Sequence, residues 1–89
     1  MLKIGDLVRL RSGFNEVGTR VYKERQGLVR ISYSRTFFSN EFGLYLGTNN
    51  LAEYKSEKPG FWEDIILVGE EKLHIPQGVL VKAEVVKDV

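Results

Sequence analysis

The sequence LVRISY at residues 28–33 decides the expected fold, because apolar side chains occupy every second position. Side chains alternate between the two faces of a β-strand, so a period of two predicts a strand with one buried side. Val29, Ile31 and Tyr33 are expected to face a core, which would turn Arg30 towards solvent.

The same period predicts strands along most of the chain. The expected strands cover residues 6–11, 19–23, 28–33, 42–46, 61–68 and 79–86. In the fourth of them Phe42, Leu44 and Leu46 share one face. Glycine, asparagine and proline interrupt the pattern between strands and favour turns, and a tight turn is expected at residues 69–71. No apolar stripe with helical spacing is sustained, so helix is limited to a turn or two around residues 50–53. Short strands with these turns indicate an all-β small barrel or sandwich.

Length and composition predict a single domain over residues 1–89. A chain of 89 residues seldom supports two cores, and a hydrophobic fraction of 43% is that of a folded globular chain. The absence of cysteine excludes a disulfide framework and thiolate metal sites. The longest apolar run, residues 65–68, is too short to cross a bilayer, and the amino terminus has no signal-peptide pattern. We therefore expect a cytoplasmic protein with no membrane contact.

Charge is divided unevenly along the chain, although the net charge is only +1. The first forty residues contain eight basic and three acidic side chains, for a net charge of +5. From Glu41 onward five lysines stand against nine carboxylates, for a net charge of −4. Every arginine lies in the first part, and the planar guanidinium can grip a phosphate or carboxylate at two points.

Two parts of the chain resemble a known family. KIGDLVRL at residues 3–10 resembles the glycine-aspartate start of SH3-like small barrels. Residues 62–86 are similar to the distal hairpin, the proline-led helical turn (LHIPQG, 73–78) and the last strand of an SH3 domain. Small open reading frames of tailed phages often combine these features with a strand like GLYLG. The resemblance implies an SH3-like small barrel and a phage-type accessory protein. It also places Trp62 where SH3 domains often display a ligand-contacting tryptophan.

The chain departs from that family between residues 12 and 41. This stretch is longer and more basic than the corresponding SH3 loop, and residues 19–33 within it are expected to form a hairpin. No tyrosine-rich segment follows the first strand to make a groove for proline-rich peptides. The resemblance therefore implies a fold and no ligand, and the expected fold is an SH3-like barrel with an enlarged, basic first loop that contains a hairpin.

Catalysis has little support in the residue pattern. His74 is the single histidine, so a metal site would lack a second imidazole and any thiolate. The neighbouring carboxylates Glu63 and Asp64 would point to opposite faces of a strand, which is poor geometry for a cooperating acid and base. No glycine loop precedes a helix that could cradle phosphate. We expect no enzyme activity, no metal and no cofactor.

The remaining signal is a mixture of arginines and aromatic residues, which together can pair phosphates and stack bases. Phe37 and Phe38 are consecutive, so both cannot face inward from one regular strand. The candidate ligand-binding residues are Arg20, Tyr22, Arg25, Arg30, Arg35, Phe37, Phe38 and Trp62. The alternative is a solvated outer face with the rings buried in the core.

Three functions remain open at the level of sequence. The first is a non-catalytic module that captures an anionic ligand, either nucleic acid or a nucleotide. The second is protein recognition of a host factor, with the two opposite charges orienting the encounter. The third is a structural component of a virion, in which strand edges and exposed rings contact neighbouring subunits. A homo-oligomer is compatible with each of them.

Overall fold

The computed structural model describes residues 1–25, 28–50 and 62–84, apart from the side chains of residues 24, 25, 28, 29 and 50. These residues form strands and turns with no helix, which confirms the all-β prediction. The strands are β1 (Leu7–Leu10), β2 (Glu16–Arg25), β3 (Leu28–Phe38), β4 (Gly43–Asn50), β5 (Trp62–Val68), β6 (Glu71–Pro76) and β7 (Leu80–Lys82).

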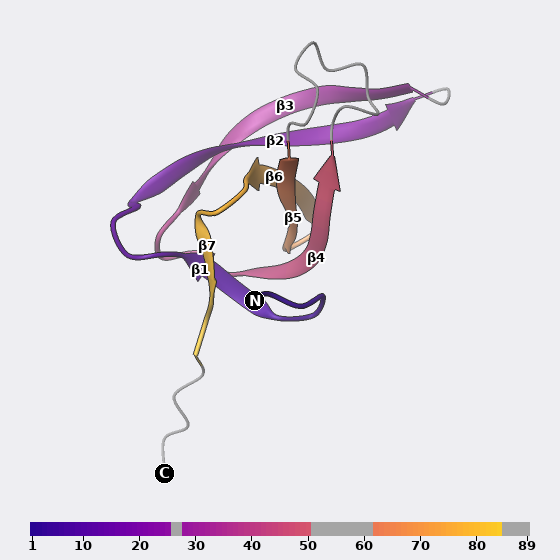
Figure 1. Ribbon diagram of the computed structural model, residues 1–89. Helices are drawn as coiled ribbons and strands as arrows, with labels where there is room; N and C mark the ends of the chain where they lie inside the picture. The colour runs from indigo at the N-terminus through magenta and orange to yellow at the C-terminus, as the bar shows by residue number, and fades with distance from the viewer. Residues whose placement is uncertain (26–27, 51–61, 85–89) are drawn as a thin grey trace.

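The strands make one antiparallel sheet in the order β3-β2-β6-β5-β4-β1-β7. The sheet curls, as Figure 1 shows. Side chains from β1 and from the distant β3 therefore meet in one core. Register shifts at Val21/Tyr22 and at Tyr45/Gly47 interrupt the pairing, and such irregularities bend strands. Within the described residues, the edge strands β3 and β7 do not pair, so the sheet is not closed.

The core lies inside this curl and consists of aliphatic residues with two aromatic rings. Its buried members are Val8, Leu10, Val21, Phe37, Tyr45, Ile66, Leu73, Ile75, Val79 and Leu80. Val8 and Leu10 are both buried on the inner face of β1. The cross-strand partners Tyr45, Ile66 and Leu73 continue the inner face across β4, β5 and β6. Alternation along each strand then places the intervening side chains on the outer face.

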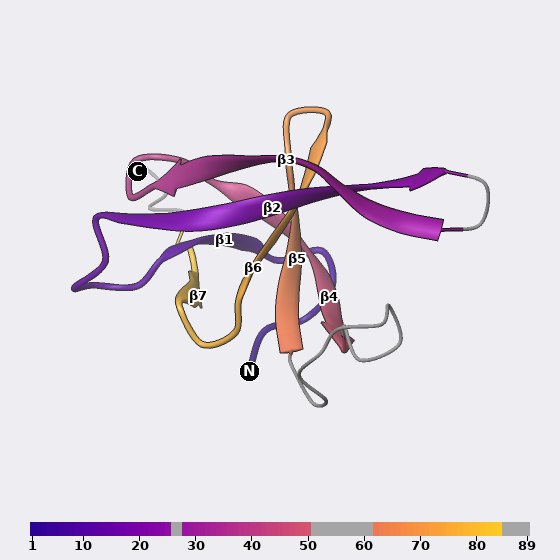
Figure 2. The same cartoon turned by 90° about the horizontal axis from the view of Figure 1, so that it is seen from above.

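The hairpin of β2 and β3, which we call the ribbon, is longer than expected and extends past the rest of the sheet. Figure 2 shows β2 and β3 crossing over β4–β6 and continuing beyond them. The molecule measures 50 × 25 × 23 Å along its principal axes. Ile31 is 53% exposed and Tyr33 is 42% exposed. The expectation that they face the core is therefore wrong, because the ribbon leaves the core at the cross-strand pair of Val21 and Tyr33.

The outward and inward faces of β4 are also the reverse of what its leucines suggest. Phe42 and Leu44 are exposed, whereas Gly43 and Tyr45 point into the core. A Cβ atom on Gly43 would lie 3.0 Å from Cδ1 of Ile66 and 3.2 Å from Cγ2 of Val68. The glycine is thus the residue that lets β4 approach β5 closely. Because it has no apolar side chain, a hydrophobicity pattern does not mark its face of β4 as the buried one.

The carboxyl-terminal part differs from the SH3-like expectation in one element. The segment LHIPQG contributes Leu73 to Pro76 to strand β6 and then a turn at Gln77 and Gly78, so the predicted helical turn is wrong. The turn at residues 69–70 between β5 and β6 is confirmed. In the described part of the predicted last strand, residues 79–84, only Leu80–Lys82 form a strand, β7. The expected helical turn at 50–53 begins on a β4 residue, and its remainder lies outside the described residues, as do residues 85–89.

Candidate functional site

A groove on the outer face of the ribbon is the best candidate site. Its volume is about 370 Å³, and it is lined by Gly18, Thr19, Arg20, Ser34, Arg35 and Thr36. Arg20 pairs directly with Ser34, and Gly18 pairs directly with Thr36. Along β2, Gly18 and Arg20 flank the buried Thr19, and along β3, Ser34 and Thr36 flank Arg35. Because side chains alternate between faces, these four residues share the outer face. The groove therefore combines one guanidinium, two hydroxyl groups and the space beside a glycine.

Arg20 is held at this groove by one side chain of another strand and one of its own strand. Its terminal nitrogen NH1 lies 3.5 Å from Oε2 of Glu63 on β5. A hydrogen bond with the Tyr22 side chain is the main factor that raises the pKa of Arg20, and the Glu63 charge acts in the same direction. The pairing of Arg20 with both Ser34 and His74 makes a continuous row across β3, β2 and β6. The Arg20 side chain remains 44% exposed, so a ligand in the groove can reach it.

Glu63 and His74 form a buried polar pair behind Arg20. Glu63 is only 1% exposed, and its Oε1 lies 3.8 Å from Nδ1 of His74. Neither atom has a hydrogen-bond partner in the part of the chain that the structure describes. Burial raises the pKa of Glu63 against the opposing effect of Arg20. Burial, assisted by Lys72, lowers the pKa of His74, so both shifts favour the neutral forms. The Tyr22 ring packs edge-on against the His74 ring at 4.5 Å.

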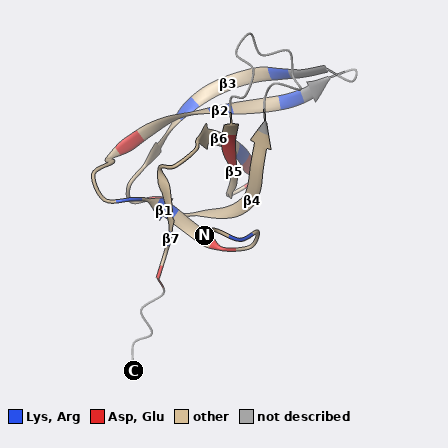
Figure 3. Cartoon of the chain, viewed as in Figure 1, with Lys and Arg blue, Asp and Glu red and all other residues tan. Residues whose placement is uncertain are grey.

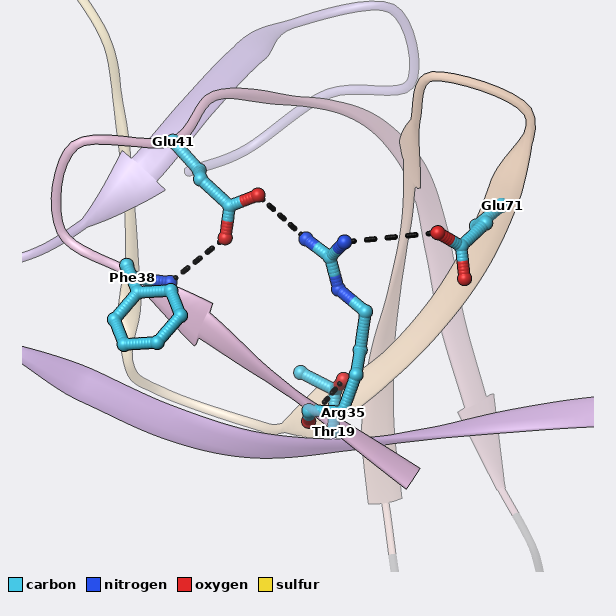
Figure 4. Close-up of polar contacts among 5 residues, drawn as sticks. All are labelled: Thr19, Arg35, Phe38, Glu41 and Glu71. Carbon is cyan, nitrogen blue, oxygen red and sulfur yellow. Dashed lines mark hydrogen bonds and ion pairs between the residues drawn. The ribbon is translucent and has the colours of Figure 1, made fainter. Parts of the chain in front are cut away.

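Arg35 is engaged by internal carboxylates. Figure 4 shows its two terminal nitrogens directed at Glu41 and Glu71, with NH2 2.6 Å from Oε1 of Glu41 and NH1 3.6 Å from Oε1 of Glu71. Glu41 also accepts a hydrogen bond of 2.9 Å from the backbone N–H of Phe38. Arg35 therefore ties β3 to the turn before β4 and to β6, and we assign it to the framework of the groove instead of to ligand contact.

The other predicted site residues are dispersed. Arg30 is exposed on the ribbon, and the side chain of Arg25 lies outside the described set. Phe37 is fully buried in the core while Phe38 is 47% exposed, because regular alternation sends the two rings to opposite faces. Trp62 is likewise exposed, but it begins β5, where it pairs with Asn50 instead of with the ribbon.

Sequence reasoning missed five residues of this site, namely Gly18, Thr19, Ser34, Thr36 and Glu63. The spacing of Ser34 and Thr36 on one face of a strand was visible, but their partners on β2 depend on the hairpin register. Glu63 was set aside as half of an adjacent carboxylate pair. In the structure Asp64 instead faces inward, where it accepts hydrogen bonds from the hydroxyls of Tyr45 at 3.2 Å and Thr48 at 3.1 Å.

Other features of the described residues add no further chemistry. Their histidine, aspartate and glutamate side chains do not gather in threes as a metal ion would require. They also include no helix long and apolar enough to cross a membrane. No family model, no curated protein and no solved structure matches this chain.

Proposed function

We propose that the protein is a non-catalytic binding module that captures an anionic ligand, nucleic acid or a nucleotide, on the ribbon. The observation that supports this proposal is the groove of Gly18, Arg20, Ser34 and Thr36 on a projecting strand pair. Figure 3 shows basic segments along β2 and β3, and among the described side chains of the ribbon the exposed cations are Arg20, Lys23 and Arg30.

The shape of the ribbon suits a nucleic-acid ligand. A two-stranded β-ribbon fits the major groove of duplex DNA, and exposed rings stack on unpaired bases. Tyr33 supplies such a ring on the ribbon, with Ile31 two residues away. Phosphates attract guanidinium groups without regard to sequence, so the first contact would be electrostatic. This mode needs neither a deep pocket nor a catalytic group.

We also propose that the sheet is an SH3-like barrel whose first loop is replaced by the ribbon. The position of the β2–β3 hairpin between β1 and β4 supports this arrangement. The phage-type origin and the assignment as an accessory protein remain predictions that follow from the resemblance alone.

Binding through the ribbon predicts a steep dependence on salt. Each phosphate contact made by a basic side chain lowers the logarithm of the affinity by about 0.7–0.9 per decade of salt concentration. Fluorescence anisotropy with a labelled single-stranded oligonucleotide and a labelled duplex, at several NaCl concentrations, measures this slope. Three ribbon contacts should give a slope of about −2 to −3. An affinity that does not change with salt would instead favour a protein partner.

A double variant tests whether the basic side chains of the ribbon bind the oligonucleotide. Arg20→Ala/Arg30→Ala should weaken oligonucleotide binding by about tenfold or more, because each charge-assisted contact contributes roughly 1 kcal/mol or more. Lys3→Ala is the matched control, since Lys3 is exposed on a segment outside the ribbon. Circular dichroism confirms that each variant is folded. Equal effects of the double variant and the control would contradict binding on the ribbon.

A second candidate function is recognition of a protein partner. Leu7 on β1 pairs with Leu44 on β4, which pairs with Leu67 on β5, and the first two are more than one-third exposed. Phe42 is exposed beside this row. Exposed apolar rows of this kind mark contact surfaces. Leu44→Glu should then abolish capture of the partner in a pull-down while leaving oligonucleotide affinity unchanged.

A virion role predicts recovery of the chain from purified particles.

A further inference from the structure

The four outer-face residues of the groove make a compact square. Arg20 stands opposite Ser34 and Gly18 opposite Thr36, in two successive pairs on the same face. Directly opposed side chains in an antiparallel pair have Cβ atoms about 5 Å apart, and neighbours two residues along a strand are about 7 Å apart. All polar groups of the square are therefore within reach of one small ligand group.

The two hydroxyl groups are available to such a ligand. Other hydroxyls of the ribbon are used internally, since Thr19 donates to the Arg35 carbonyl at 2.8 Å and Ser32 donates to the Val21 carbonyl at 2.9 Å. Within the described residues, the hydroxyls of Ser34 and Thr36 make no such bond. They can both donate to an acceptor placed above the square.

The conformation and packing of β2 do not require a glycine at position 18. Its φ is not positive, and the register shift of β2 lies further along, at Val21/Tyr22. An added Cβ would have no atom within 4 Å, so no close neighbour requires a glycine. Glycine weakens a strand interior, and without a bulge or a bend it marks a place where another group approaches the backbone. Here the open side faces the groove.

We infer that Gly18, Arg20, Ser34 and Thr36 form a seat for one phosphate group. This inference rests on the proposed function and specifies which group of the anionic ligand is held. Arg20 supplies the charge, the Ser34 and Thr36 hydroxyls donate hydrogen bonds to phosphate oxygens, and Gly18 leaves the space. Glu63 acts as a positioning residue, because its buried carboxylate lies 3.5 Å from the Arg20 guanidinium.

The decisive variant is Gly18→Val, which fills the seat without removing any contact of the fold. Valine favours strands and meets no atom near its Cβ, so the thermal midpoint should stay the same or rise. The probe is inorganic phosphate, titrated while amide signals of the protein are followed by NMR. In the wild-type protein, the amides of residues 18–20 and 34–36 should shift together with one dissociation constant. In Gly18→Val that affinity should fall by about tenfold or more.

Two further variants define the contacts. Ser34→Ala/Thr36→Val removes both hydroxyls and should weaken phosphate binding by about tenfold. Lys3→Ala is the control, because Lys3 is an exposed cation outside the ribbon, and it should change the phosphate affinity by less than about twofold. Wild-type phosphate affinity in Gly18→Val would overturn the seat. Phosphate shifts spread evenly over all basic residues would overturn it as well.

The same variants with a mononucleotide and an oligonucleotide separate this inference from the proposed function. If both ligands bind with a salt-dependent affinity that Gly18→Val leaves unchanged, the proposed function stands and the seat is wrong. If inorganic phosphate occupies the seat but neither ligand binds more tightly than phosphate itself, the seat stands and the proposed function is wrong. A loss confined to the mononucleotide would identify a terminal phosphate as the group that is held.

Discussion

Individual charged residues in this protein have clearly different tasks, although they look alike in the sequence. Arg35 has both terminal nitrogens close to internal carboxylates, whereas Arg30 is exposed on the ribbon. Arg20 is intermediate, because it contacts the buried Glu63 and is still half-exposed. A cation bound to carboxylates from other elements stabilises the fold, while an exposed cation is free to serve a ligand.

Replacement of Arg35 tests its structural role. Arg35→Ala should lower the free energy of unfolding by about 1–2 kcal/mol, because Glu41 and Glu71 lose their partner and β3 loses its link to β6. Arg30→Ala should change it by less than about 0.5 kcal/mol. Urea denaturation followed by tryptophan fluorescence measures both values. Equal stability of the two variants would show that the Arg35 ion pairs contribute nothing.

The buried pair behind Arg20 predicts two opposite pH dependences. His74 has a lowered pKa, so the unfolded state takes up a proton first below about 6.5, and stability falls with decreasing pH. Glu63 has a raised pKa, so the folded state keeps its proton longer above about 4.5, and stability falls with increasing pH. The two contributions oppose one another in the wild-type protein.

Single substitutions should separate these contributions. Glu63→Gln leaves the His74 contribution, so stability between pH 5 and 7 should rise with pH more steeply than in the wild-type protein. His74→Gln leaves the Glu63 contribution and should shift the slope towards negative values. Urea midpoints at half-unit pH steps measure the slopes. Parallel curves for all three proteins would mean that neither group has a shifted pKa.

At the scale of elements, β4 and the ribbon show how far a strand pattern can be trusted. The alternation in residues 42–46 predicted a strand, and β4 covers Gly43–Asn50. The buried face was wrong, because Gly43 and Tyr45 point inward. Alternation separates a strand into two faces but does not say which face its neighbours cover. Only the approach of β5, which needs a glycine, decides that question for β4.

Two glycine substitutions test this difference between elements. Gly43→Ala should destabilise the protein by about 1–3 kcal/mol, because the new Cβ would lie 3.0–3.2 Å from side-chain atoms of Ile66 and Val68. Gly18→Ala is the matched control, with no atom within 4 Å of the new Cβ, and should be neutral or stabilising by up to about 1 kcal/mol. Thermal unfolding of the two variants compares them directly. The reverse order would contradict the packing of β4 on β5.

At the scale of the whole molecule, the ribbon separates the basic part of the chain from the core. Among the described side chains of β2 and β3, Val21 and Phe37 enter the hydrophobic core, Val17 packs against it, and Thr19 is buried as well. The outer end of the ribbon has solvent on both faces, which explains why Ile31, Tyr33 and Arg30 are all exposed. The described basic residues of the ribbon lie along β2 and β3, whereas Lys3, Arg9 and Arg11 lie on or next to β1.

The sequence by itself determined that the chain is all-β, where most strands lie, and that turns fall at residues such as 69–70. These features depend on local backbone preferences and on the period of two, which a sequence displays directly. Only the tertiary structure decided which face of each strand is buried and which β2 residue stands opposite Ser34. It also decided that Glu63 lies beneath Arg20. Those outcomes depend on register and on contacts between strands far apart in the chain, and neither is encoded in the alternation of any single segment.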